Sequence, residues 1–389
     1  MQIQLTDSAV KKINAGNPLI QKEDLKNTPA TLPTTWVELT DSRGKFVARG
    51  YLGEQNKGLG WVVSFDQTSI DQVFLIRLFN EAKMRRAHYF NDPLTTAFRV
   101  FNGEGDGLGG VTIDFYADYL VISWYNQTIY QLKEELIASL RHVYPEVAGV
   151  VEKNRFKQAK QESQWVAGTK PVEPLIVKEN GVNYAVYLNE GYMTGIFLDQ
   201  KEVRGRLLET SAGKRVLNMF SYTGAFSVAA AVGGALETTS VDLAQRSLPK
   251  TQEQFTVNGL AVAQQKIIVM DTFEYFRYAA RKNLTYDLII LDPPSFARNK
   301  KKTFSVLKDY GRLIEDSVEI LADQGVIIAS TNAANFPKKK FQQTIEQALQ
   351  KQKVTYQLKT TFRLPPDFPA VKQLAESNYL KVLVYEINK

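Results

Sequence analysis

The 389-residue sequence contains no cysteine and two histidines. Without cysteine the chain can form no disulfide, no thiolate metal site and no covalent intermediate on a sulfur nucleophile. His88 and His142 alone make a histidine-rich metal site or a serine–histidine triad improbable, and we predict no metal ligands. The chemistry left open therefore relies on carboxylates, amides, hydroxyls, aromatic rings or a bound cofactor.

Long apolar runs are also missing. No stretch approaches the ~20 residues that a membrane span needs, and Met1–Leu5 lacks the basic and apolar regions of a signal peptide. We therefore expect a cytoplasmic protein with no membrane partner. An apolar fraction of 44% is typical of globular chains, and the length predicts two or three domains. The net charge of +7 permits a polyanionic partner without requiring one.

The first 70 residues contain short strand-like runs between turn residues. The runs Trp36–Leu39, Phe46–Leu52 and Trp61–Phe65 predict a small β-barrel over residues 1–70. A helix is expected over residues 69–89 because its apolar residues recur at helical spacing. Four basic side chains on this helix fit a solvated face and an RNA-facing one equally well: Arg77, Lys83, Arg85 and Arg86.

Residues 71–180 read as a central α+β domain. Its glycine-rich connector, Asn102–Gly110, resembles a phosphate-binding loop only superficially, because no Lys-Ser/Thr pair and no evident helix follow it. We interpret this connector as a tight structural link between a strand and a hairpin.

From about residue 181 apolar strands alternate with helices, which predicts a parallel, doubly wound, Rossmann-like sheet over residues 181–389. The strands are expected at Val216–Phe220, Thr238–Val241, Ile267–Met270, Leu288–Leu291 and Val326–Ala329. The helices are expected at Ala225–Ala231, Ser247–Val257, Thr272–Lys282, Phe304–Leu321 and Lys338–Lys351. The final runs, Tyr356–Phe362 and Tyr379–Ile387, indicate an antiparallel hairpin at the edge of the sheet.

Three strand ends carry residues suited to an adenosine-type ligand, which binds beyond the carboxyl ends of such strands. The loop Ser221–Ser227 places Gly224 before a helix N-terminus, and its single glycine suits a carboxylate better than a pyrophosphate. Asp242 can accept both ribose hydroxyls and Asp271 an exocyclic amine. Either aspartate alone is more simply a helix N-cap. The ordered set, however, predicts S-adenosylmethionine as the cofactor.

A fourth strand ends in Leu291-Asp292-Pro293-Pro294-Ser295-Phe296. Two prolines cannot continue a β-ladder, and they stiffen the chain. We expect Asp292 and the carbonyls of Pro293 and Pro294 to hold the edge of a planar, amino-bearing ring, with Phe296 stacked on its face. The alternative for Phe296 is a core aromatic packed under the loop.

Several fragments resemble the bacterial class I S-adenosylmethionine-dependent 23S rRNA methyltransferases that begin with a PUA domain, an RNA-binding module. The fragments are Asn102–Gly109, Gly195–Gln200, Val216–Ser227, Val257–Leu260 and Leu291–Phe296, and the resemblance covers essentially the whole chain. It implies a PUA-like barrel, a central α+β domain and a Rossmann-like methyltransferase domain. A homodimer is expected from the resemblance alone. The resemblance also implies a set of cofactor contacts: Phe197, Asp199, Gln200, Phe220, Ser221, Tyr222, Thr223, Gly224, Asp242, Asp271 and Asp292.

The missing cysteine bears on the target atom. The best-known members of this family resemble cytosine-C5 methyltransferases, in which a cysteine lies just after the fifth strand; that place reads Ala329–Ala333 here, without cysteine. Methylation at C5 ordinarily requires thiolate attack on C6, for which a hydroxyl is no easy substitute. A related branch, similar to the guanine-N7 methyltransferase half of a fused 23S rRNA enzyme, has Ser-Asn-Asn there, and Thr331-Asn332 looks closer to it.

Methyl transfer to nitrogen needs alignment of the reacting atoms and no covalent catalyst. We therefore predict methylation of a 23S rRNA base at a nitrogen, in guanine, with Asn332 orienting the base edge. Two basic runs are expected to contact RNA phosphates on the same rim: Arg298, Lys300, Lys301 and Lys302, and Lys338, Lys339 and Lys340. Tyr310 and Arg312 are weaker candidates for this rim.

Three alternatives stay open. The first is cytosine-C5 methylation by a mechanism without cysteine. The second is an RNA-binding protein whose methyltransferase domain is inactive. The third is a methyltransferase that acts on a protein or a small molecule.

Overall fold

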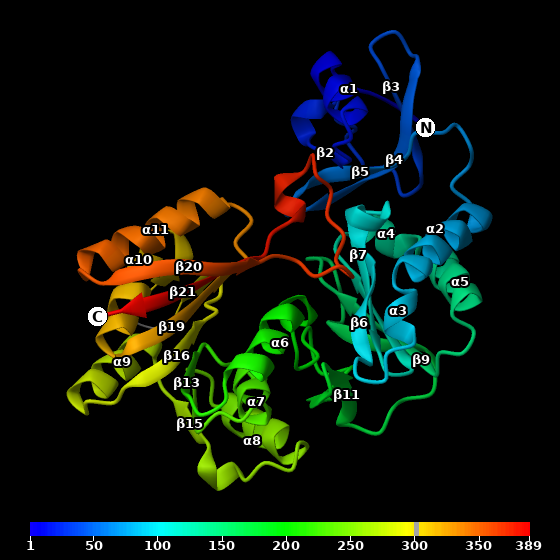
Figure 1. Cartoon of the computed structure of the whole chain (residues 1–389). Coiled ribbons are helices and arrows are strands. Elements are labelled where there is room, and N and C mark those ends of the chain that lie inside the picture. The colour runs from blue at the N-terminus through cyan, green and yellow to red at the C-terminus, as the bar shows by residue number, and fades with distance from the viewer. Residues whose placement is uncertain (299–302) are drawn as a thin grey trace. The chain divides into compact units, whose positions relative to one another are not determined.

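The computed structural model describes residues 1–298 and 303–389, and the chain divides into two compact units (Figure 1). The first unit consists of Met1–Val177, Val186–Thr194 and Pro366–Asn378. The second consists of Lys178–Ala185, Gly195–Pro365 and Tyr379–Lys389. The predicted limit near residue 180 lies close to the first of these breaks, whereas no sequence signal marked the two short later segments that join the first unit.

The N-terminal part of the first unit is a five-stranded sheet in the order β1-β3-β4-β5-β2. The predicted runs correspond to β3 (Val37–Thr40), β4 (Phe46–Gln55) and β5 (Gly58–Ser64). Two short strands and a helix had no prediction: β1 (Gln2–Gln4), β2 (Leu19–Ile20) and α1 (Asp7–Asn14). Helix α1 begins after Thr6, whose Oγ1 accepts the N–H of Ala9 at 3.2 Å.

The rest of the first unit is built on a second five-stranded sheet, in the order β10-β9-β8-β7-β6. Its strands are β6 (Ala97–Asn102), β7 (Val111–Tyr116), β8 (Tyr119–Trp124), β9 (Gly149–Asn154) and β10 (Ser163–Gly168). The helices of this part are α2 (Gln72–Arg85), α3 (Ala87–Phe90), α4 (Gln127–Gln131) and α5 (Lys133–Val143). Tyr51 and Trp61 of the N-terminal sheet pack in the same core as Phe98 and Leu120, so the two sheets share buried apolar surface.

The glycine-rich connector Asn102–Gly110 is a packing element, as predicted. A Cβ atom on Gly105 would lie 1.8 Å from the carbonyl oxygen of Pro369, and one on Gly109 would lie 2.2 Å from the Trp61 ring. The Tyr51 hydroxyl donates a hydrogen bond to the Gly109 carbonyl at 2.7 Å. Only glycine allows this close approach of the backbone to its neighbours.

Arg86, which directly follows α2, is only 1% exposed. It therefore lies neither on a solvated helix face nor on an RNA-facing one, and both interpretations are wrong for this residue. Its guanidinium forms an ion pair with Asp106 (Nη2–Oδ2 2.6 Å) and donates to the carbonyls of Arg99 and Asp367. Arg85 also pairs with Asp106, at 2.8 Å, and Lys83 donates to the Val143 carbonyl. These cations stabilise the first unit internally.

The second unit contains a seven-stranded sheet in the order β15-β14-β13-β16-β19-β21-β20. The predicted parallel strands are β13 (Arg215–Met219), β14 (Glu237–Asp242), β15 (Lys266–Val269), β16 (Tyr286–Leu291) and β19 (Leu321–Thr331). The predicted antiparallel edge is also confirmed, by β20 (Thr355–Phe362) and β21 (Lys381–Asn388). A two-stranded sheet, β11 (Leu175–Glu179) with β12 (Val182–Val186), precedes this fold.

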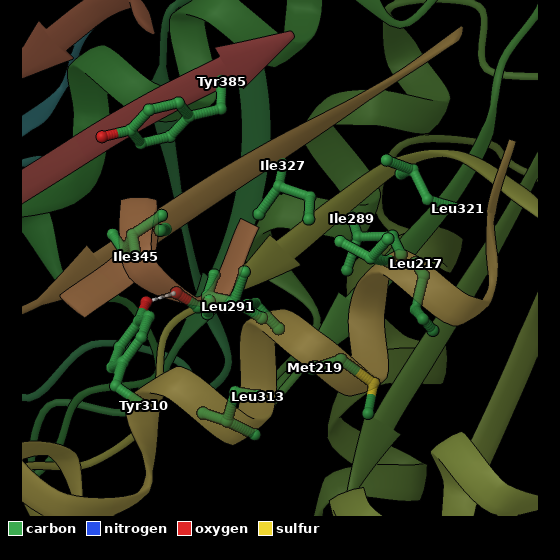
Figure 2. Close-up of a cluster of buried hydrophobic side chains, with 14 of the residues drawn as sticks. Leu217, Met219, Ile289, Leu291, Tyr310, Leu313, Leu321, Ile327, Ile345 and Tyr385 are labelled. Carbon is green, nitrogen blue, oxygen red and sulfur yellow. Dashed lines mark hydrogen bonds between the residues drawn. The ribbon is translucent and has the colours of Figure 1, made fainter. Parts of the chain in front are cut away.

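Helices cover both faces of the large sheet. On one face, α9 (Thr272–Arg281), α10 (Val306–Glu319) and α11 (Lys338–Lys351) pack on the core around Leu217 and Ile289, part of which is drawn in Figure 2. On the other face, α6 (Lys201–Thr210) and α7 (Ala225–Val232) pack on Val216 and Leu288. Helix α8 (Ser247–Thr256) follows β14. Adjacent strand residues thus face opposite cores, which explains the nearly continuous apolar runs of the sequence.

Among the described residues, no helix combines the length and the apolar character that crossing a membrane requires.

Candidate active site

The sheet order brings four predicted strand ends to one edge. β13 lies between β14 and β16, and Met219 is in register with both Val241 and Leu291. Ala329 of β19 is in turn paired with Leu291. The segments that follow β13, β14, β16 and β19 therefore begin side by side, at the edge where open α/β sheets bind their ligands.

The turn after β13 has an unusual backbone. Phe220, Tyr222 and Gly224 adopt positive φ angles of 60°, 52° and 76°. Positive φ is uncommon for residues other than glycine and concentrates at functional sites. A Cβ on Gly224 would lie 2.5 Å from Thr251 Cγ2, so glycine is required here for space as well as for φ.

Helix α7 begins directly after this turn, and no side chain in the described part of the chain caps it. Its first N–H groups are oriented outward from the helix N-terminus, an arrangement that binds carboxylates. Ser221 and Thr223 are buried, and Thr223 Oγ1 donates to the Gly195 carbonyl at 2.7 Å. That bond joins the turn to the segment that contains Phe197, Asp199 and Gln200.

Asp242 and Asp271 have different surroundings. Asp242 Oδ2 accepts the N–H of Tyr222 and Oδ1 accepts the N–H of Ala244, both at 2.8 Å. The N-cap position of α8 is Arg246, so Asp242 is no helix cap, and its fixed carboxylate keeps lone pairs for hydroxyl groups. Asp271 is the N-cap of α9, and its Oδ1 accepts the N–H groups of Phe273 and Glu274. Its contact with a cofactor amine stays a prediction.

The short helix η3 (Leu198–Gln200) supplies a buried amide. Gln200 Nε2 donates to Ser330 Oγ at 2.8 Å and to Asp292 Oδ1 at 3.2 Å. Its Oε1 is buried and has no hydrogen-bond partner in residues 1–298 and 303–389. Buried acceptors are rarely left unpaired, so a ligand N–H group would complete this site.

Two further side chains flank the amide. Asp199 Oδ2 accepts a hydrogen bond from the Tyr379 hydroxyl at 2.9 Å. The ring of Phe197 is 42% exposed and lies 5.4 Å from the Tyr222 ring, centroid to centroid. Phe220, by contrast, packs partly into the core, 5.8 Å from the Phe304 ring, so its contribution at this edge is mainly its backbone.

Asp292 is an unusual carboxylate. Burial, with a smaller contribution from the nearby Asp199 carboxylate, raises the pKa of Asp292 from its ordinary 3.8 to about 6. Hydrogen bonds from Ser330 and Gln200 and the charge of Arg204 oppose this rise. At neutral pH Asp292 is mostly ionised, yet it holds a proton far more readily than a surface aspartate. Such perturbed carboxylates are common in active sites.

The segment after Asp292 exposes its aromatic ring. Pro293 is buried, Pro294 is exposed, and Phe296 begins the strand β17 (Phe296–Arg298), which pairs with β18 (Thr303–Ser305). Phe296 is 62% exposed. The alternative interpretation of Phe296 as a core aromatic is therefore wrong. Its stacking on a base stays a prediction.

Asn332 lies beside this segment. Its Oδ1 accepts a hydrogen bond from Ser295 Oγ at 2.8 Å, which joins the segment after β16 to the one after β19. Its Nδ2 donates to no group in the part of the chain that the structure describes, and the residue is exposed. Asn332 therefore presents free N–H donors beside the segment that follows Asp292.

Tyr310 is not a rim residue, and that prediction is wrong. The residue is fully buried, and its hydroxyl lies 3.1 Å from the Leu291 carbonyl (Figure 2). It also lies 2.8 Å from the Ser330 carbonyl. Tyr310 thus bridges β16 and β19 just before Asp292 and Thr331. Arg312 is exposed, 3.5 Å from Asp316.

The predicted basic runs lie partly within the described structure. Arg298 is exposed at the end of β17. Lys338, Lys339 and Lys340 form the exposed first turn of α11, and Lys338 Nζ donates to Thr361 Oγ1 at 3.3 Å. Lys300, Lys301 and Lys302 lie outside the described residues.

Sequence reasoning missed four residues of this edge: Ser330, Tyr379, Lys381 and, in its bridging role, Tyr310. Ser330 stood in a quoted motif without an assigned role. Lys381 forms the first residue of a buried strand and donates to the Ala333 carbonyl at 2.7 Å. The one available signal was a lysine at the start of an otherwise apolar run, which usually indicates a solvated strand end.

The observed groups fit S-adenosylmethionine. The uncapped N-terminus of α7 would hold its carboxylate, Gln200 Oε1 would accept from its amino group, and Asp242 would accept from its ribose hydroxyls. When bound, the cofactor supplies a methyl group activated on a sulfonium. No group of three or more His, Asp or Glu side chains in the described residues is arranged to bind a metal ion.

Comparison with known proteins agrees with this geometry. Residues 126–386 match the S-adenosylmethionine-dependent methyltransferase family, and residues 3–65 match a PUA-like domain. YwbD of Bacillus subtilis strain 168, provisionally named a ribosomal RNA large subunit methyltransferase, is 49% identical over 99% of both chains. The ribosomal RNA large subunit methyltransferase I of Yersinia pseudotuberculosis is 30% identical over 89% of this chain and 88% of its own.

Among solved structures, a protein designated SMU.776, provisionally named a methyltransferase and crystallised with SAH, is 45% identical, with a TM-score of 0.94 over 99% of this chain and all of its own. The predicted fold, with its PUA-like domain and methyltransferase domain, is confirmed, and so is the cofactor. The chain belongs to the S-adenosylmethionine-dependent methyltransferase family.

Proposed function

We propose that this enzyme methylates a base of large-subunit (23S) ribosomal RNA, at a nitrogen of guanine. The names of its relatives support rRNA as the substrate, and so does the PUA-like domain, an RNA-binding module in the family that the sequence resembles. The net charge of +7 is compatible with a polyanionic partner.

One observation carries the choice of a nitrogen. The chain has no cysteine; β19 ends at Thr331, and Asn332, which follows it, contacts Ser295 in the segment after Asp292. Addition to cytosine C6 needs a nucleophile as good as a thiolate. Thr331 is fully buried, and its Oγ1 accepts the N–H of Ala333 at 3.2 Å, so it is a poor substitute. A ring or amino nitrogen needs no covalent catalyst.

Asp292 and Asn332 suit the Watson–Crick edge of guanine. The Asp292 carboxylate can accept from a base N–H, and the free Asn332 amide can donate to a carbonyl oxygen. Guanine carries N–H donors at N1 and N2 next to an acceptor at O6. A nucleotide extruded from its helix exposes this edge to the enzyme.

The exposed residues Phe296, Arg298 and Lys338–Lys340 complete the proposal as RNA contacts. Stacking of a base on Phe296 would contribute about 1–3 kcal/mol. The first turn of α11 contains three lysines and no acid, although a helix N-terminus disfavours cations. This placement strengthens the positive potential at the rim, which suits phosphate binding.

Nucleoside mass spectrometry of rRNA from a deletion strain tests the function. We expect the loss of one methylated guanosine from 23S rRNA. The wild-type gene should restore this nucleoside, and a gene with the Asp242→Ala substitution should not. Loss of 5-methylcytidine would contradict the nitrogen assignment. Unchanged rRNA would point to a protein or small-molecule substrate, and failure of the purified protein to bind SAH in calorimetry would point to an inactive domain.

Phe296→Ala tests the stacking contact. The unfolding free energy should change by less than about 0.5 kcal/mol because the ring is exposed, whereas affinity for substrate RNA should fall about 5- to 100-fold. Phe296→Tyr keeps a ring and serves as the control. Equal RNA affinity of the alanine and tyrosine variants would exclude stacking.

Lys339→Ala tests the rim. It should weaken RNA binding. The slope of the logarithm of the dissociation constant against the logarithm of salt concentration should fall by roughly one, since one phosphate contact is lost. Lys351→Ala, in the last turn of the same helix and paired with Glu315 at 2.7 Å, is the matched control.

The homodimer stays a prediction, which light scattering of the purified protein checks.

A further inference from the structure

Lys381 occupies a place that a lysine rarely occupies. It is the first residue of β21, and it is paired in register with Thr331 at the end of β19. Because β21 runs antiparallel to β19, its first residue lies at the same edge as the carboxyl ends of the parallel strands. Lys381 therefore belongs to the edge that carries Asp292 and Asn332.

The ammonium group of Lys381 is costly to the fold. The residue is 8% exposed, and burial lowers the pKa of Lys381 to about 8. Its one hydrogen bond within the described residues goes to the Ala333 carbonyl. Taking an ammonium out of water without an acidic partner is unfavourable, and an apolar side chain of similar volume would be better for stability. A role in stability alone does not explain the residue.

That hydrogen bond completes a clamp on the turn after β19. Thr331 Oγ1 accepts the Ala333 N–H at 3.2 Å, and Lys381 Nζ donates to the Ala333 carbonyl at 2.7 Å. The residue between Thr331 and Ala333 is Asn332. Both polar groups of the Ala333 backbone are thus held, and the carbonyl also accepts the N–H of Phe336 at 3.0 Å. The backbone that follows Asn332 is therefore fixed, while the Asn332 side chain itself contacts Ser295.

We propose that Lys381 is a positioning residue of the methyl-transfer site, which fixes the Thr331–Ala333 turn and so holds the Asn332 amide toward the acceptor base; this inference rests on the proposed function. A charged donor forms a stronger bond to a carbonyl than a neutral one does. Alignment errors of about 1 Å at a transfer site reduce rates by up to about a hundredfold, so a rigid turn matters more here than elsewhere on the surface.

A double-mutant cycle in rRNA methylation tests the proposal. Lys381→Met should lower kcat/KM about 10- to 100-fold in the wild-type background. In an Asn332→Ala background the same change should cost less than about twofold, because the two residues act through one turn. Lys381→Arg should retain activity within about fivefold, since it keeps a charged donor. Equal losses in both backgrounds would indicate a merely structural role and overturn the proposal.

Hydrogen exchange provides a readout that needs no RNA substrate. In Lys381→Met, or in Lys381→Gln should that variant not fold, the peptide covering residues 329–336 should exchange faster, while residues 286–291 of β16 stay unchanged. Lys359→Met is the matched control, because Lys359 lies on β20 with 40% side-chain exposure and pairs with Glu386 at 3.0 Å. Unchanged exchange at 329–336, or the same change in the control, overturns the proposal. Absence of rRNA methylation by the wild type would count against the proposed function instead.

Discussion

Replacing Asp292 with asparagine should make the protein more stable and less active. The residue sits at the end of β16, where burial raises the pKa of its carboxyl to about 6. Asparagine has nearly the same shape, and its oxygen can still accept the hydrogen bond from Gln200 Nε2. It cannot take a proton or carry the negative charge. The substitution therefore removes the unfavourable free energy of the buried charge and keeps the hydrogen bond with Gln200.

The expected gain follows from the pKa. A rise from 3.8 in the unfolded chain to about 6 in the fold corresponds to at most roughly 3 kcal/mol. Because Asp292 is partly exposed, about 1–3 kcal/mol is the realistic range. The folded state favours the protonated carboxyl, so the penalty is absent below pH 3.8 and complete once the pH exceeds 6. The stability gain of Asp292→Asn should consequently be larger at pH 8 than at pH 5.

Urea unfolding of wild type and variant across pH 5–8 measures this gain, and methyl transfer to rRNA measures the loss, which we expect to exceed about 100-fold. Asp287→Asn on the same strand is the matched control. Hydrogen bonds from Arg215 lower the pKa of Asp287, so its stabilising charge is present at pH 8 and is lost on acidification. Its removal should destabilise at pH 8. An Asp292→Asn protein that is less stable at pH 8, or whose gain does not shrink toward pH 5, would refute the reasoning.

Three further substitutions have defined outcomes. Gly224→Ala forces a Cβ within 2.5 Å of Thr251 at a φ of 76°. Titration calorimetry should show that the affinity for SAH falls more than about tenfold. Scanning calorimetry should show that the free energy of unfolding falls by about 1–2 kcal/mol. Tyr310→Phe removes the one hydroxyl proton that the carbonyls of Leu291 and Ser330 share, and urea unfolding should show a loss of about 1–3 kcal/mol in the free energy of unfolding. Arg86→Met leaves the buried Asp106 carboxylate short of its main partner and should cost about 3–5 kcal/mol, read from thermal unfolding.

The fold of the second unit was predictable because its elements are long and periodic. The predicted strand Val216–Phe220 differs by one residue from the observed Arg215–Met219, and the helix Lys338–Lys351 is as predicted. In the first unit, β1 and β2 escaped prediction because strands of three and two residues contain too few side chains to show an alternation. The burial of Arg86 depends on Asp106 and Asp367, which are distant in sequence.

The candidate site was predictable where topology alone decides proximity. Parallel strands end at one edge, so residues that follow them meet whatever the details of packing. The pKa of Asp292 and the link from Gln200 to Ser330 depend on distances of a few tenths of an ångström, which no pattern contains. Tyr310 was misplaced for a similar reason, because its helix turns it into the core and toward the strand-end carbonyls.

Lys381 shows where strand-end reasoning should be extended. The predicted site residues follow the carboxyl ends of parallel strands, yet an antiparallel strand in the same sheet brings its amino end to that edge. The side chain of a charged first residue on such a strand lies either in solvent or at the ligand-binding edge. The register with the neighbouring strand β19 determines which of the two it is. Here β21 is covered by β20 on its other side, so its start is enclosed and Lys381 turns to the Ala333 carbonyl. In mixed sheets, polar residues that open an inner antiparallel strand should therefore be counted as site candidates alongside those that close the parallel ones.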